Sequence, residues 1–170
     1  IGADAVFNMA SSLNFGKSFD ICEGIASAAG SLPQRESLDN IAYLANFSIG
    51  QGELLLSPAA MLTLYCAAAY DGSYALPTAV SGTLSGGRFT PVSERGRTRV
   101  MTARTAKELR EYLSAVITEG TGTAARPKSV SAAGKTATAQ TGKYENGKEI
   151  CEGWFCGFFP ADEPEYTVIV

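Results

Sequence analysis

Residues 133–140 read Ala-Gly-Lys-Thr-Ala-Thr-Ala-Gln, and the spacing of residue types here decides the fold that we expect. Threonine alternates with small residues along this stretch, which is the two-residue period of a β-strand. Asn146-Gly147 follows as a two-residue hairpin turn, and the apolar run 150–159 supplies the returning strand. The β-branched run 166–170 adds a third strand, so this end of the chain predicts an antiparallel meander.

The sequence before the meander is mostly helical in its hydrophobic pattern. Apolar residues keep helical spacing over 4–13 and, more briefly, over 38–45. A helix expected over 57–70 starts with Ser-Pro, an N-cap followed by proline at the first helical position, and it is apolar all round. A helix of that kind is buried. Residues 17–37 and 72–101 carry turn residues and predict loops, the second with short strands.

A further helix is predicted just before the strands. Thr105-Ala-Lys-Glu108 has the spacing of a capping box, and Gly120 provides a C-terminal stop. Five apolar residues line one face between them: Leu109, Tyr112, Leu113, Val116 and Ile117. A meander packed against helices is an α+β fold, and 170 residues suit one domain.

The composition excludes several classes of function. The chain has no histidine, so it holds neither a Ser-His-Asp triad nor a His-Glu-x-x-His zinc site. Its four cysteines form no C-x-x-C pair, and we expect neither a metal nor a cofactor. A net charge of −3 with scattered Lys and Arg argues against nucleic-acid binding, and no apolar run is long enough to span a membrane.

The stretch 134–140 allows two mechanistic interpretations. Gly-Lys-Thr ends the phosphate-loop pattern, but Ser129 stands where that pattern needs glycine, and a strand rather than a helix follows. We therefore favour the second, in which Lys135 lies on an edge strand beside a cleft. Such a strand pairs its backbone with an extended substrate, while the ammonium and threonine hydroxyls hold a carboxylate.

Further blocks make a resemblance specific. In order, they are Leu13-Asn-Phe-Gly-Lys17, Ser48-Ile-Gly-Gln-Gly52 with Ser57-Pro58, Glu119-Gly-Thr-Gly-Thr-Ala124, Ala133-Gly-Lys-Thr-Ala-Thr-Ala-Gln140 and Gly153-Trp-Phe-Cys-Gly-Phe-Phe-Pro160. With these blocks the chain resembles the C-terminal part of the transpeptidase domain of a penicillin-binding protein, of the high-molecular-weight, monofunctional class B. These proteins are penicillin-recognising serine enzymes.

The resemblance implies an activity and a site. The parent protein would be a D,D-transpeptidase that cross-links peptidoglycan through a serine acyl-enzyme. Its substrate would be the D-Ala-D-Ala end of a stem peptide, which β-lactams mimic. Lys135 and Thr138 would be the catalytic residues of this segment, since the N–H of Thr138 would be one of two oxyanion donors. The substrate-binding residues would be Lys135, Thr136, Ala137, Thr138 and Gln140.

Two departures from the family pattern matter. Ala137 stands where the Lys-Thr-Gly motif has glycine, so a methyl group projects where a close approach is usual. No Ser-x-x-Lys occurs in the 170 residues, so the acylated serine and its lysine are absent. Ser12-Leu13-Asn14 mimics the Ser-x-Asn element, but it merges into the downstream block and Ser12 falls at the end of a predicted helix. We reject it as that element.

Both ends of the sequence look cut, because Ile1 opens inside a predicted helix and 166–170 stop in mid-strand. We therefore expect residues 1–170 to be the C-terminal portion of one transpeptidase domain, truncated at both ends, soluble and inactive alone. The parent would be anchored to the extracytoplasmic face of the bacterial membrane, with cell-wall synthesis proteins as candidate partners. A D,D-carboxypeptidase, a β-lactam sensor, or a non-catalytic relative that binds cell-wall peptide or a protein partner stay as alternatives.

Overall fold

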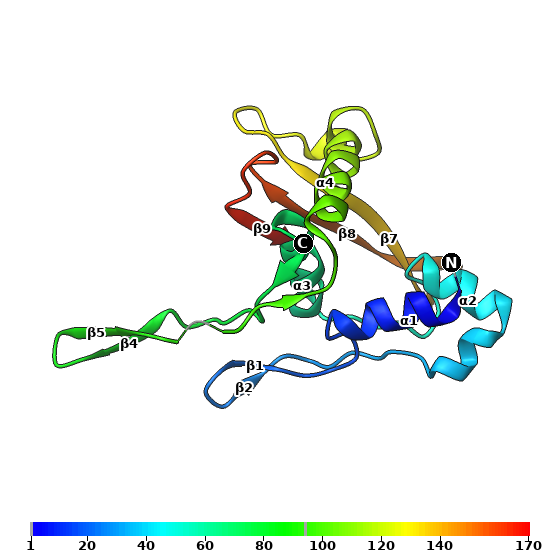
Figure 1. Ribbon diagram of the computed structural model, residues 1–170. Helices are drawn as coiled ribbons and strands as arrows, with labels where there is room; N and C mark the ends of the chain where they lie inside the picture. Colours follow the sequence, from blue (N-terminus) through cyan, green and yellow to red (C-terminus); the bar gives the residue numbers. More distant parts are fainter. Residues whose placement is uncertain (1, 94) are drawn as a thin grey trace.

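The computed structural model describes residues 2–93 and 95–170, which fold around one central helix (Figure 1). The four α-helices of this part are α1 (Ala3–Ser12), α2 (Ile41–Ser48), α3 (Pro58–Ala69) and α4 (Ala103–Thr118). Its largest sheet is antiparallel, with three strands in the order β7 (Ala133–Glu145), β8 (Lys148–Phe159) and β9 (Tyr166–Ile169). The predicted α+β fold with a meander is confirmed.

Shorter elements connect these parts. Three strand pairs are β1 (Asp20–Cys22) with β2 (Ile25–Ala26), β4 (Gly82–Ser85) with β5 (Arg88–Pro91), and β3 (Ser73–Tyr74) with β6 (Thr98–Arg99). Two 3₁₀ helices are η1 (Arg35–Asp39) and η2 (Thr123–Ala125). Figure 1 shows β4 and β5 at the end of an arm that reaches away from the body. The β3–β6 pair lies at the base of this arm.

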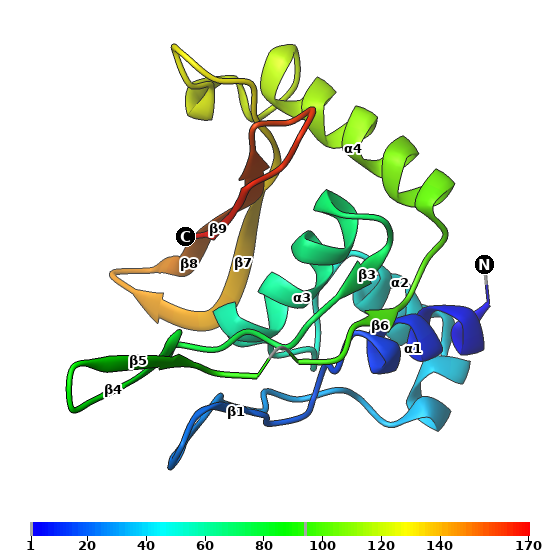
Figure 2. The same ribbon diagram turned by 60° about the vertical axis from the view of Figure 1, so that its left-hand side comes forward.

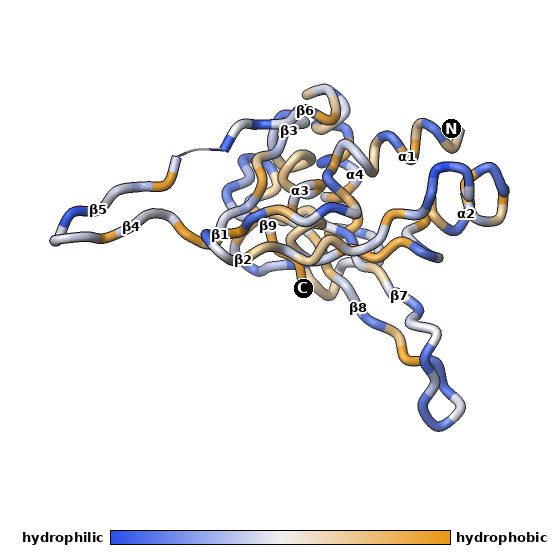
Figure 3. Tube along the Cα trace, turned by 90° about the horizontal axis from the view of Figure 1, so that it is seen from below, coloured by the Kyte–Doolittle hydropathy of each residue, from blue (hydrophilic) through white to orange (hydrophobic). Residues whose placement is uncertain are grey.

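The β7–β8 hairpin follows the sequence closely. Asn146 and Gly147 both have positive φ, 50° and 76°, as a turn that matches strand twist requires. The register runs from Ala133 opposite Phe158 to Glu145 opposite Lys148, with one irregularity between Gln140 and Tyr144. The far end of the hairpin projects from the body and is largely hydrophilic (Figure 3).

Helix α3 is buried on two sides, as its all-round apolar sequence predicted. Ala60 and Ala67 belong to a core that α1 and α2 complete, with Leu13, Leu38 and Phe47. The neighbouring Tyr65, Ala68 and Ala69 belong to a second core, with residues of α4 and of the sheet: Leu113, Ala133, Cys156 and Phe158. Figure 2 shows α3 between the sheet and the α1–α2 group. The helix therefore holds the two cores together.

Hydrogen bonds at the helix ends explain where the helices begin. The Ser57 hydroxyl accepts from the N–H of Ala60, so α3 starts where the sequence placed it. Helix α2 starts three residues later than predicted, because the Asn40 side chain accepts from the N–H of Ala42. Ser12 is the last residue of α1, as predicted, and its hydroxyl donates to the carbonyl of Met9.

The predicted start of α4 was wrong by one turn. Its N-cap is Thr102, whose hydroxyl accepts from the N–H of Thr105 at 3.1 Å, so Thr105 lies inside the helix. The earlier start is consistent with the burial of Ala106, which is fully enclosed. Tyr112 was also assigned to the wrong face, since it is 72% exposed while Leu113 and Ile117 are buried.

A pair of glycines supports the first residues of β7. Gly134 and Gly157 lie opposite each other, and the Phe155 ring lies over both of them. A Cβ at Gly157 would sit 2.5 Å from the carbonyl oxygen of Ala133, and one at Gly134 would sit 2.7 Å from that of Cys156. Backbone atoms cannot move away as a side chain can, so the two strands need glycine here to keep Lys135 in place.

We expect Gly157→Ala to lower the free energy of unfolding by about 1–3 kcal/mol, because the methyl group overpacks against a strand backbone. Gly153→Ala in the same strand is the matched control, since its Cβ would meet no atom within 4 Å. Urea unfolding of both variants followed by circular dichroism measures the difference. Equal stability of the two variants would contradict the role given to the glycine pair.

Candidate substrate-binding site

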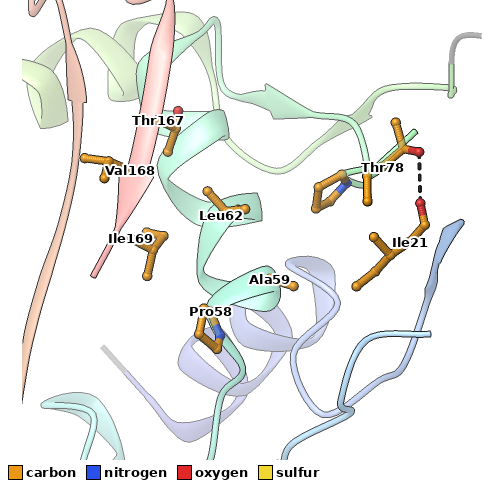
Figure 4. A pocket seen from close by; sticks show the side chains of 10 residues that line it. Ile21, Pro58, Ala59, Leu62, Thr78, Thr167, Val168 and Ile169 are labelled. Atoms are coloured by element: carbon orange, nitrogen blue, oxygen red, sulfur yellow. Dashed lines mark hydrogen bonds between the residues drawn. The ribbon is translucent and has the colours of Figure 1, made fainter. Parts of the chain in front are cut away.

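Two hollows formed by the described residues differ in their chemistry. The first, about 440 Å³, lies between β9, the start of α3 and residues 77–79 (Figure 4). Its described lining carries no charged side chain, and the Thr78 hydroxyl there donates to the carbonyl of Ile21. The second hollow, about 500 Å³, lies along β7 and is lined by four of the five predicted substrate-binding residues.

Three parts of the chain build the hollow along β7. One wall is residues 135–139 of β7, and the opposite wall is the loop 49–56 that joins α2 to α3. The remaining surface comes from α3 and from β8, by Met61, Tyr65, Glu152, Trp154 and Cys156. Of the described lining residues, Lys135 and Glu152 are charged. The hollow is thus mainly apolar, with a cation on its β7 wall.

The register of the sheet decides which β7 side chains share a face. Lys135 lies opposite Cys156 and Ala137 lies opposite Trp154. Opposed residues of an antiparallel pair point to the same side, so these four side chains share one face of the sheet. Trp154 lines the hollow and also packs against the core beneath it. The Ala137 methyl, which replaces the glycine of the family motif, projects on this same face.

The backbone of β7 pairs only with β8 among the described strands, which leaves one edge free. Phe155 of β8 exchanges both of its backbone hydrogen bonds with Val170, at 2.9 and 2.8 Å. Its N–H and C=O therefore point away from β7, and its partner Thr136 forms a non-hydrogen-bonded pair. The N–H and C=O groups of Thr136, and of Thr138 two residues further, consequently point to the free edge.

Side chains engage three groups along this edge. The Lys135 ammonium donates to the carbonyl of Thr136, and the Gln51 amide donates to the carbonyl of Thr138 at 3.4 Å. The hydroxyls of Thr121 and Thr136 are hydrogen-bonded at 3.1 Å. The edge that faces the hollow thus has both outward carbonyls occupied from within the chain.

Four of the five predicted substrate-binding residues lie together. Lys135, Thr136, Ala137 and Thr138 all line the hollow. Gln140 does not line it, because its amide donates to the Glu149 carboxylate at 2.9 Å, beside the irregularity in the β7–β8 register.

Gln51 and Thr121 had no predicted role in the site. Both fall in blocks that carried the family resemblance, and the structure brings both to the edge of β7. Gly50 and Gly52 flank Gln51 with positive φ of 77° and 85°. Gly50 has no neighbour within 4 Å of its Cβ position, so its backbone conformation, and not a close contact, requires glycine. A Gly-Gln-Gly triplet is the signal that could have pointed to this turn.

Two titratable groups that line the hollow, Cys156 and Tyr65, are uncharged near neutral pH. Burial raises the pKa of the Cys156 thiol to about 11 and also raises the pKa of the Tyr65 phenol. Both groups are therefore protonated under ordinary conditions. The described residues contain no group of three or more His, Cys, Asp or Glu side chains able to hold a metal ion. Nor does this part of the chain include a helix long and apolar enough to cross a bilayer.

Comparisons with known proteins identify the family of the chain. A family model for the penicillin binding protein transpeptidase domain matches residues 1–170. Peptidoglycan D,D-transpeptidase MrdA of Acinetobacter baumannii is 32% identical over 136 residues, which are 72% of this chain and 20% of that protein. Penicillin-binding protein 3 of Bacillus subtilis is 28% identical over 126 residues, 72% of this chain and 18% of the relative.

A solved structure extends the likeness to most of the described fold. Penicillin-binding protein 3 of Mycobacterium tuberculosis, complexed with aztreonam, has a TM-score of 0.80 and 28% identity over 96% of this chain and 38% of that one. The chain belongs to the penicillin-binding protein transpeptidase domain family. The resemblance found in the sequence blocks is thereby confirmed. The chain spans about a fifth of the length of the two curated relatives.

The depth of the hollow can be tested through its cysteine. Cys151 is exposed in β8, whereas Cys156 is buried with a raised pKa. Because the thiolate is the reactive form, we expect iodoacetamide at pH 8 to alkylate Cys151 roughly tenfold or more faster than Cys156. Peptide mass spectrometry of time-quenched samples measures both rates. Similar rates would show that solvent reaches the floor of the hollow freely.

Proposed function

We propose that this chain forms one wall of the active site of a peptidoglycan D,D-transpeptidase. The observation that carries the proposal is the free edge of β7, where outward backbone groups and Lys135 face an apolar hollow. An edge of this kind binds an extended peptide by adding it as a strand. Family membership, and the aztreonam bound to the related mycobacterial protein, support the substrate class.

Different residues of β7 would bind different groups of the substrate. The D-Ala-D-Ala end of a stem peptide would lie along the edge, with its carboxylate held by the Lys135 ammonium and the Thr138 hydroxyl. The outward N–H of Thr138 would be an oxyanion donor, and removing one such donor typically costs about 2.7–4 kcal/mol. The described β7 strand thus offers charge and a hydrogen-bond donor to the developing oxyanion, but no nucleophile.

The nucleophile would come from outside these residues. No Ser-x-x-Lys motif occurs in the sequence, and nucleophilic catalysis needs the serine within hydrogen-bond reach of its base. The serine Oγ would attack the carbonyl carbon of the penultimate D-Ala and expel the terminal D-Ala. An amine of a second stem peptide would then attack the acyl-enzyme and release the serine. We propose that residues 1–170 are the C-terminal portion of that domain and are inactive alone.

One observation favours a second candidate function. The Ala137 methyl lies on the face that lines the hollow, where the family motif has glycine. A cleft narrowed there would still bind peptide along the edge but would react poorly, as a non-catalytic relative would. With either function, the protein would act at the extracytoplasmic face of the membrane, beside other cell-wall synthesis proteins.

A fluorescent penicillin tests the proposed function. We expect the full-length protein to form a covalent adduct by intact mass, and the 170-residue chain to form none. Lys135→Ala should lower the second-order acylation rate constant about 10²–10³-fold, because it removes positive charge beside the reacting carbonyl. Lys143→Ala, at the exposed far end of β7, is the control and should react normally. An adduct on the isolated chain, or normal acylation of Lys135→Ala, would overturn the proposal.

Reversion of Ala137 separates the two candidate functions. We expect Ala137→Gly to raise the acylation rate constant of the full-length protein about two- to tenfold, because it removes a methyl group from the binding face. Ala139→Gly removes a methyl group from the same wall of the hollow two residues further along, so it shows whether the effect is specific to position 137. Acylation that appears only in Ala137→Gly would instead identify the natural protein as the non-catalytic relative.

A further inference from the structure

Gln51 contacts the binding strand from across the hollow. It lies in the loop 49–56, 87 residues before Thr138, and its side-chain amide donates to the Thr138 carbonyl at 3.4 Å. The separation makes this contact a consequence of the tertiary fold. It is also long for a hydrogen bond between uncharged groups, whose usual length is about 2.9–3.0 Å, so it is weak and easily exchanged.

The loop holds the backbone of Gln51 firmly while its side chain stays half-buried. The N–H of Gln51 donates to the carbonyl of Asn46 at 2.8 Å, and the N–H of Gly50 donates to the carbonyl of Phe47 at 3.0 Å. Phe47 is 6% exposed in the core shared by α1, α2 and α3. The loop is therefore anchored to the end of α2, and only the side chain of Gln51 is free to leave the edge of β7.

The atom that Gln51 occupies is the one that an added strand would need. A peptide that pairs with β7 must donate an N–H to an outward carbonyl of the edge. The outward carbonyls beside the hollow are those of Thr136, which accepts from Lys135, and of Thr138. A ligand that is held at its carboxylate by Lys135 therefore meets the Gln51 amide at the next hydrogen-bonding position.

We propose that Gln51 is a positioning residue: its amide is hydrogen-bonded to the Thr138 carbonyl in the free protein, and the amide N–H of a bound ligand replaces it there. The inference rests on the proposed function, because it takes an acylated amino acid or its β-lactam mimic as the ligand. Gln51 keeps the Thr138 carbonyl hydrogen-bonded when no ligand is present, and it admits ligands that carry an N–H able to replace its own. A ligand without such an N–H forms no hydrogen bond with the Thr138 carbonyl, so displacing the Gln51 amide does not increase its affinity.

The test compares two classes of β-lactam on the full-length protein. Stopped-flow kinetics gives the dissociation constant of the non-covalent complex and the acylation rate constant separately. Gln51→Met keeps the length of the side chain and removes its donor. For a penicillin with an acylamino N–H, we expect this variant to lower the dissociation constant about two- to tenfold, because no internal hydrogen bond must be broken. The acylation rate constant should not change.

A carbapenem, which lacks the acylamino group, should bind Gln51→Met and the wild type equally. Gln34→Met, at an exposed position before η1, is the control for the substitution itself. Gln51→Asn, which retains an amide but is one methylene shorter, should behave like Gln51→Met. Thermal unfolding of every variant shows that each one is folded.

The outcomes separate this inference from the proposed function. A wild type that is acylated, with Gln51→Met binding the penicillin no more tightly, would overturn the inference and leave the proposed function standing. Equal gains for penicillin and carbapenem would also overturn it, since a loop that merely opens the hollow would help both ligands. A folded wild type that takes up neither ligand would overturn both.

Discussion

The burial of α3 on two sides is the constraint on which the rest of the structure depends. Ala67 packs into the core of α1 and α2, and the next residue, Ala68, packs into the core of α4 and the sheet. The one polar side chain fully enclosed on this helix, Thr63, donates its hydroxyl to the carbonyl of Leu13. Because one rigid helix belongs to both cores, the loop before it and the strands beside it have a fixed separation. The hollow along β7 is the space that this separation leaves.

The site uses main-chain groups more than side chains, and this follows from the position of β7 at the edge of the sheet. The glycine pair Gly134 and Gly157 lets β7 and β8 approach under the Phe155 ring. Two residues further along, Thr136 and Thr138 direct their backbone N–H and C=O groups to the free edge, and side chains of the same chain hydrogen-bond both carbonyls. One lysine adds charge to this edge, and the surrounding apolar surface limits competition from water. Because pairing with β8 fixes the positions of these backbone groups, a few side chains are enough to make the edge selective.

Local signals predicted the parts of the fold that local chemistry controls. Asn146-Gly147 and Ser57-Pro58 specify a turn and a helix start almost alone, and the structure has both where the sequence placed them. The start of α4 was missed because two threonines compete as caps, and the burial of Ala106 is a tertiary effect. In the candidate site, the family resemblance pointed to Lys135, Thr136, Ala137 and Thr138, which all line the hollow. The contact of Gln51 could not be predicted, because it depends on where α2 and the sheet come to lie around α3.

The arm that carries β4 and β5 is held at its base, where Ser73 and Tyr74 pair with Arg99 and Thr98 and where Arg99 meets Asp71 at 2.6 Å. The Thr78 hydroxyl and the N–H of Ala79 also donate to the carbonyl of Ile21. Leu84 and Phe89 near its end are exposed, and neither belongs to a core. Loop closure costs little more for a longer loop than for a shorter one. Evolution is therefore free to lengthen, shorten or replace this arm without moving the hollow, which makes it the natural place for homologous chains to diverge.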